Sequence, residues 1–131
     1  MKMKYKVVVR TLLQDSPKDF EMSAALIIAE YFQTDVEFLR SSHMKTPDLL
    51  ILGKIWELKS PRGNSKNTIR NNIRTARKQS ENIIIDLRRC KLREEKSISR
   101  IKEVYLKRKR KSGTYLIICK NGSVVDIRDV I

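Results

Sequence analysis

Two carboxylates and an amine stand close together in the sequence, at Asp48, Glu57 and Lys59. An apolar run follows Asp48, and a turn signal at Gly53-Lys54 separates it from the segment that carries Glu57 and Lys59. Side chains two residues apart on a strand share a face, so Glu57 and Lys59 should point the same way. A tight hairpin would bring Asp48 opposite this pair, and a hard cation could then be held between Asp48 and Glu57.

This set of groups suits the cleavage of phosphodiesters. Mg²⁺ (or Mn²⁺) prefers oxygen ligands and is usually held by one or two carboxylates together with substrate phosphate. The metal would polarise a phosphoryl oxygen and activate a water, while the ammonium of Lys59 would stabilise the charge that develops on the phosphate. The alternative is structural: Glu57 and Lys59 would form an ordinary exposed ion pair, and Asp48 would be a turn residue.

Charge and composition limit the classes of partner. The 131 residues include 29 Lys and Arg against 15 Asp and Glu, which leaves a net charge of +14. Such an excess attracts polyanions at long range, so we expect nucleic acid as the partner. The sequence has no apolar stretch near the roughly 20 residues that span a bilayer, and no signal peptide is recognised. We therefore expect no membrane association and a cytoplasmic site of action.

The hydrophobic patterns predict an α/β (α+β) domain with a mixed β-sheet flanked by helices. Hydrophobic residues make up 40% of the chain, enough for a single domain over residues 1–131. The expected strands cover residues 4–11, 35–39, 48–59 (a hairpin), 82–87, 114–120 and 123–130, and the expected helices cover 18–33, 65–80 and 94–109. The helix over 65–80 should carry Gln79 on one flank of its apolar seam and three arginines on the other.

The order helix, strand, strand, strand, helix, strand from residue 17 to 88, with Pro47-Asp48 and Glu57-Leu58-Lys59, resembles the PD-(D/E)xK nuclease superfamily. Within it, Trp56 to Ser60 and Ile69 to Asp86 look like the C-terminal tRNase domains of contact-dependent growth inhibition toxins. The resemblance implies a nuclease-like αβββαβ core with an added helix and a C-terminal β-hairpin. It also implies a metal-dependent nuclease acting on tRNA, delivery into a target cell, and an acidic immunity protein as a partner.

The same resemblance implies roles for individual residues. Asp48 and Glu57 would ligate the metal, either one ion or two, and Lys59 would assist at the scissile phosphate. Superfamily members often add a glutamate from the first helix, and both Glu21 and Glu30 are candidates here. We favour Glu21, because it lies in the first turn and helix N-termini favour carboxylates.

Further residues are expected to contact the substrate. Gln79 would contact substrate or water. Basic residues in and before the second helix would follow a nucleic-acid backbone beside the site. These residues are Arg62, Lys66, Arg70, Arg74, Arg77 and Lys78.

Three other functions are compatible with the same residues. A DNA endonuclease of the same fold would use the same carboxylates. A non-catalytic basic module would bind nucleic acid without turnover, with Asp48 and Glu57 in structural roles. A protein that docks on an acidic partner would also account for the net charge.

Overall fold

A computed structural model describes residues 5–10, 16–39, 48–65 and 67–131 of the chain. Its centre is a seven-stranded sheet in which the strands follow one another in chain order from β1 to β7. The strands are β1 (Val7–Val9), β2 (Val36–Phe38), β3 (Asp48–Ile51), β4 (Lys54–Lys59), β5 (Ile83–Asp86), β6 (Tyr115–Ile118) and β7 (Val124–Asp126). The helices are α1 (Asp19–Phe32), α2 (Thr68–Arg77) and α3 (Glu94–Lys107), and a 3₁₀ turn η2 (Ile127–Asp129) follows β7.

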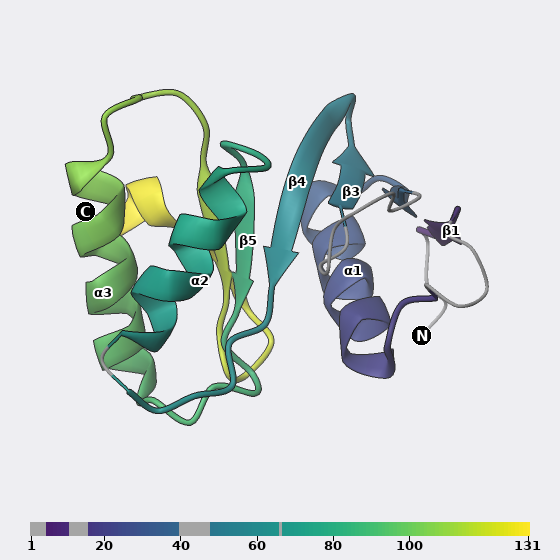
Figure 1. The fold of residues 1–131 in the computed structure, drawn as a ribbon. Coiled ribbons are helices and arrows are strands. Elements are labelled where there is room, and N and C mark those ends of the chain that lie inside the picture. The colour runs from purple at the N-terminus through teal and green to yellow at the C-terminus, as the bar shows by residue number, and fades with distance from the viewer. Residues whose placement is uncertain (1–4, 11–15, 40–47, 66) are drawn as a thin grey trace.

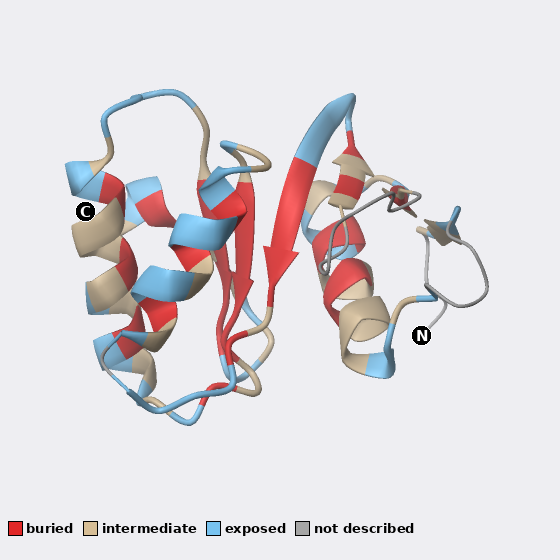
Figure 2. Ribbon diagram, viewed as in Figure 1, coloured by how far each residue is buried: buried red, intermediate tan, exposed pale blue. Residues whose placement is uncertain are grey.

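The sheet is mixed and is covered on both faces. β4, β5 and β6 run parallel, β3 is antiparallel to both of its neighbours, and β7 is antiparallel to β6. α1 packs on one face with Trp56 and Leu58, while α2 and α3 pack on the other face with Ile83 and Ile85 (Figure 1). The buried strands between these layers form the core (Figure 2). The mixed class, the flanking helices and the αβββαβ order expected from the sequence are confirmed.

A two-residue turn joins β3 to β4. Leu52 and Gly53 both have positive φ, at 50° and 78°, which is the geometry of a type I′ hairpin turn. The sequence placed the turn at Gly53-Lys54, but Lys54 already pairs with Ile51 as the first residue of β4. A type I′ turn matches the twist of the two strands, and the turn therefore lies at Leu52-Gly53, one residue earlier than expected.

The helices are shorter than the sequence predicted. α1 begins after Lys18, where the Glu21 carboxylate accepts a hydrogen bond from the Lys18 backbone N–H at 2.9 Å. α2 is limited to Thr68–Arg77. None of the helices in the described ranges is long and apolar enough to cross a membrane.

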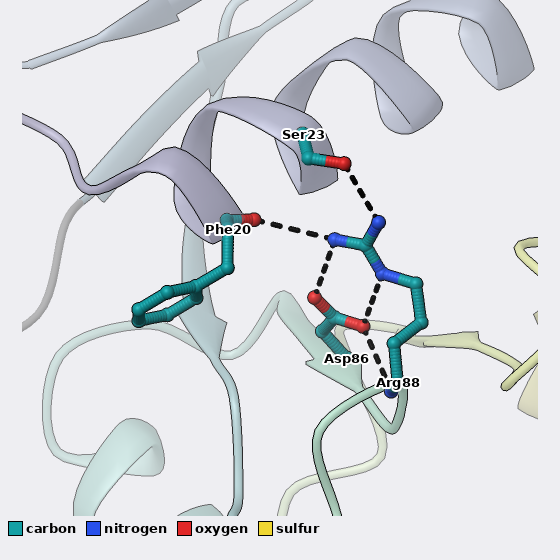
Figure 3. Close-up of polar contacts among 4 residues, drawn as sticks. All are labelled: Phe20, Ser23, Asp86 and Arg88. Atoms are coloured by element: carbon teal, nitrogen blue, oxygen red, sulfur yellow. Dashed lines mark hydrogen bonds and ion pairs between the residues drawn. The ribbon is translucent and has the colours of Figure 1, made fainter.

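Arg88 ties the end of β5 to the beginning of α1 (Figure 3). Its guanidinium donates to both carboxylate oxygens of Asp86 at 2.9 Å, to the Ser23 hydroxyl at 2.7 Å and to the Phe20 carbonyl at 3.2 Å. Asp86 is fully buried, so its charge depends on this partner. The contact fixes the N-terminal end of α1 against the sheet.

Replacing Arg88 should therefore destabilise the fold strongly. We expect Arg88→Ala to lower the free energy of unfolding by about 3 to 5 kcal/mol, because Asp86 would remain buried without its counter-charge. Urea denaturation followed by circular dichroism would measure the change. Arg128 offers a matched control, since it binds Asp126 with the same spacing and pattern but its side chain is 61% exposed. Arg128→Ala should cost about 1 kcal/mol or less, and equal losses in the two variants would contradict the role given to Arg88.

Candidate active site

Asp48 and Glu57 face each other across the β3–β4 hairpin. They are direct partners in the antiparallel register. Opposed residues in such a pair point to the same face, with Cβ atoms about 5 Å apart. Lys59 follows two residues later on that face. The structure therefore brings together the three residues that the sequence singled out, while their catalytic roles stay predictions.

This face of β4 is turned toward α2. Glu57 pairs with Ile83 and Lys59 pairs with Ile85, and both isoleucines pack in the cluster under α2. Trp56 points to the opposite layer, where it packs with α1 as expected. The carboxylates and the amine are thus enclosed between the sheet and α2.

Burial changes the electrostatics of Lys59. The Glu57 side chain is fully buried and Lys59 is only 7% exposed. Burial lowers the pKa of Lys59, because desolvation disfavours the ammonium, and the negative charge of Glu57 partly offsets this effect. Glu57 and Lys59 are therefore a coupled pair of buried opposite charges and not the exposed ion pair of the structural alternative.

Gln79, just beyond the end of α2, contacts Glu57. With its amide oriented by the surrounding hydrogen bonds, its nitrogen donates to Glu57 Oε2 at 2.6 Å and to Oε1 at 3.2 Å. Ser80 holds this end of α2 on β4, because its hydroxyl donates to the Ile55 carbonyl at 2.8 Å and accepts from the Asn82 N–H at 3.0 Å. Sequence reasoning did not identify this role of Ser80. A serine three residues before β5 is a turn signal that could have indicated it.

The Asp48–Glu57 pair has the character of a cation site. Asp48 Oδ1 is buried and has no hydrogen-bond partner among the described residues. Gln79 donates to both oxygens of the Glu57 carboxylate, a group that offers about four acceptor sites in all. Mg²⁺ and Mn²⁺ are usually held by one or two carboxylates, with waters and substrate phosphate as the other ligands. Two carboxylates on one face are compatible with such an ion, and a metal at this site stays a prediction. The described ranges contain no group of three or more His, Cys, Asp or Glu side chains placed to hold a metal.

The glutamates of α1 are not brought to this face. α1 packs on the opposite side of the sheet, and Glu21 there closes the N-terminal end of its own helix through the bond to Lys18. Glu30 is exposed, close to the other end of α1. Unsatisfied N–H groups at a helix start compete for a nearby carboxylate, which explains why Glu21 turns to its own helix.

The structure gives the neighbours of two arginines of α2. Arg70 lies 4.0 Å from Glu103 of α3, and Arg77 lies beside Tyr115 of β6. Gln79 instead reaches Glu57 on β4. That the arginines follow a nucleic-acid backbone beside the carboxylates stays a prediction. Arg74 is exposed on the arginine side of α2.

The remaining predicted contacts are distributed around the site. Arg62 is exposed in the loop after β4, and Lys78 is exposed at the end of α2, next to Gln79. Lys66 and Pro47 lie outside the described residues.

Comparison with known proteins places these features in a family. A model of the contact-dependent growth inhibition CdiA C-terminal domain matches residues 45–124, a range that includes Asp48, Glu57, Lys59 and Gln79. The fold is similar to a solved structure, the CdiA-CT/CdiI toxin and immunity complex from Burkholderia pseudomallei, with a TM-score of 0.64 and 16% identity over 93% of this chain and 98% of that one. At this identity the likeness concerns the fold. A search of the curated proteins found no match.

A divalent cation should stabilise the protein through Asp48. We expect Mn²⁺ to raise the melting temperature, with a gain of about 2.7 kcal/mol when the ion is present at one hundred times its dissociation constant. Asp48→Asn should remove most of this gain. The variant should be no less stable without metal, since the unpartnered charged oxygen is gone. Differential scanning calorimetry with and without Mn²⁺ measures both effects.

Glu30→Gln is the control for this measurement, because it removes an exposed carboxylate of α1. It should keep the full response to Mn²⁺. A response that survives in Asp48→Asn, or that is missing in the parent protein at millimolar Mn²⁺, would rule out a cation between Asp48 and Glu57.

Proposed function

We propose that this chain is a toxin-type nuclease that cleaves RNA with the help of a divalent metal ion. The proposal starts from its family, because the chain belongs to the contact-dependent growth inhibition CdiA C-terminal domain family. One observation carries the proposal. Asp48, which is half-buried, faces the buried Glu57 across the hairpin, with the buried Lys59 beside them and an unpartnered oxygen on Asp48. The αβββαβ order around these residues agrees with assignment to the PD-(D/E)xK superfamily.

The residues of the chain would divide the work as follows. Lys59 would donate to a non-bridging oxygen of the scissile phosphate, and its partial desolvation would strengthen that interaction. Gln79 would hold the Glu57 carboxylate in one orientation. Mg²⁺ or Mn²⁺ bound by Asp48 and Glu57 would supply a Lewis acid and a nucleophilic water.

RNA, and tRNA in particular, is the proposed substrate. The segments Trp56 to Ser60 and Ile69 to Asp86 resemble tRNase toxin domains, and the net charge of +14 favours a polyanion. DNA remains the alternative substrate for the same carboxylates.

An acidic immunity protein is the proposed protein partner, and the cytoplasm of a target cell is the proposed site of action. The solved neighbour is named as a toxin and immunity complex. A strongly basic toxin would bind an acidic inhibitor through complementary charge. The family also supports delivery into a target cell.

Cleavage assays with single substitutions test the proposal. Incubated with mixed tRNA and with plasmid DNA, the protein should cut tRNA when Mg²⁺ or Mn²⁺ is present and should stop when a chelator is added. Glu57→Gln and Lys59→Ala should each reduce the rate by about 10²-fold or more, since each removes charge stabilisation from the transition state. Gel electrophoresis of the products gives the rates.

Lys54→Ala serves as the control, because it removes an exposed lysine from the same strand. It should cleave at the parent rate. Parent-like cleavage by Glu57→Gln or Lys59→Ala would contradict the assignment, and binding without any turnover would favour a non-catalytic module. Cleavage of DNA alone would overturn RNA as the substrate.

The rate should also fall on the alkaline side as Lys59 loses its proton. Burial lowers the pKa of Lys59 below its ordinary value of 10.5, so the charged donor is lost as the pH rises through that lowered pKa. An arginine stays protonated up to about pH 12. Lys59→Arg should therefore keep a lower but pH-independent activity over this range. A profile of kcat/KM against pH compares the two, and an unchanged alkaline limb in Lys59→Arg would show that another group is titrating.

A further inference from the structure

A basic groove lies where the C-terminal end of α2 meets that of α3, on the side of the molecule where both helices end (Figure 1). Its volume is about 760 Å³. We call it the α2–α3 groove, and its cationic lining residues are Arg77, Lys78, Lys107, Arg108, Lys109 and Arg110. It lies on the arginine side of α2, beyond the flank that carries the carboxylate site.

The positive charge of the groove is largely uncompensated. Glu81 is the one acidic residue among the described lining, and its Oε2 accepts a hydrogen bond from the Ser112 hydroxyl at 2.6 Å. Within the described part of the chain, none of the six cations forms an ion pair with a carboxylate. Arg108 has a structural role, because it stacks 3.4 Å from the centre of the Tyr105 ring and donates to backbone carbonyls. Four of the other cations are exposed to a ligand, and these are Lys78, Lys107, Lys109 and Arg110.

Tyr115 adds a buried hydroxyl to the lining. It is 2% exposed, and its hydroxyl lies beside the Arg77 guanidinium. Burial raises the pKa of this hydroxyl, and the nearby guanidinium groups of Arg77 and Arg108 act against that rise. A hydroxyl and two guanidinium groups in one lining suit the oxygens of a phosphate.

The groove borders the proposed catalytic site at Gln79. Gln79 lines the groove, and the same side chain donates to both carboxylate oxygens of Glu57. A nucleic-acid substrate whose backbone extends past the scissile bond could occupy the catalytic site and the α2–α3 groove at the same time. An inhibitor or docking partner need not reach both places.

We propose that the α2–α3 groove binds the phosphate backbone of the same RNA whose scissile bond lies at the site of Asp48 and Glu57. The groove would hold a part of the backbone some distance from that bond. This inference rests on the proposed nuclease function. It specifies the substrate class as RNA long enough to reach from the carboxylates past Gln79 to the end of α3. A fragment of a few nucleotides would fill only the catalytic site and would bind weakly.

Binding measurements with two matched triple variants test the groove. The groove variant carries Lys107→Ala, Lys109→Ala and Arg110→Ala, all at exposed residues. The control variant carries Lys91→Ala, Arg93→Ala and Lys96→Ala, which removes the same number of lysines and arginines at the opposite end of α3. Fluorescence anisotropy, with a chelator present to keep the RNA intact, gives Kd for a folded RNA hairpin and for a trinucleotide at several salt concentrations.

The groove variant should bind the hairpin at least about ten-fold more weakly than the parent. The slope of log K against log salt should become shallower by roughly 2, at about 0.7 to 0.9 per lost phosphate contact. The control variant should change both quantities by less than half as much, and trinucleotide binding should be nearly equal in all three proteins.

Equal losses in the two variants would show a general effect of charge and would overturn the proposal. Trinucleotide binding that weakens as much as hairpin binding would make the groove part of the catalytic pocket, which also overturns it. Competition by polyglutamate as effective as that by the hairpin would identify an acidic protein as the ligand and would overturn it too. Failure of the proposed nuclease function can be told apart from failure of the groove proposal. In that case the hairpin would stay uncut with metal present, while the groove variant would still bind it more weakly than the control variant.

Discussion

The register of the β3–β4 hairpin is the constraint on which the candidate site depends. Two turn residues with positive φ, Leu52 and Gly53, leave Ile51 to pair with Lys54, and every later pair down to Asp48 and Glu57 follows from that one. A slip of one residue would send a carboxylate to the face covered by α1, because side chains alternate along a strand. The turn therefore determines the chemistry of the site although it makes no contact with it.

Asp86 and Asp48 show how differently two aspartate side chains are satisfied within the fold. Asp86 receives hydrogen bonds on both carboxylate oxygens from Arg88, and the pair joins α1 to the sheet. Asp48 has a buried oxygen that no described residue satisfies. Unsatisfied buried acceptors cost free energy and are rare in folded proteins. The unsatisfied oxygen of Asp48 lies on the same face as the buried Glu57 and Lys59, and the proposed ligand would complete its coordination.

The sequence was sufficient for those parts of the site that local rules determine. Alternation along a strand put Glu57 and Lys59 on one face, and the length of the hairpin brought Asp48 opposite them. Helical periodicity separated Gln79 from the arginine flank of α2. Burial on both faces accounts for the continuous isoleucine run of β5.

The sequence was insufficient where distant elements compete for a side chain. Periodicity gives the angle between two flanks of α2 but not which element each flank meets, so it did not indicate that Arg70 lies near Glu103 and Arg77 beside Tyr115. Glu21 satisfies the start of its own helix and is held away from the carboxylates. The bond from Arg88 to Ser23 joins residues far apart in the chain, and no local pattern predicts it.

The distribution of charge separates the groups that hold the fold from those left for a partner. Many acids of the described residues are engaged within the chain, whereas the cations at the ends of α2 and α3 are not paired with them. The engaged acids include Glu21, Asp35, Glu37, Glu81, Asp86, Glu94, Glu103 and Asp126. Because the acids are committed to backbone N–H groups, hydroxyls and arginines, the excess of +14 remains largely on the surface. A polyanion then meets little internal competition, and its binding releases counterions without breaking the contacts that hold the helices to the sheet.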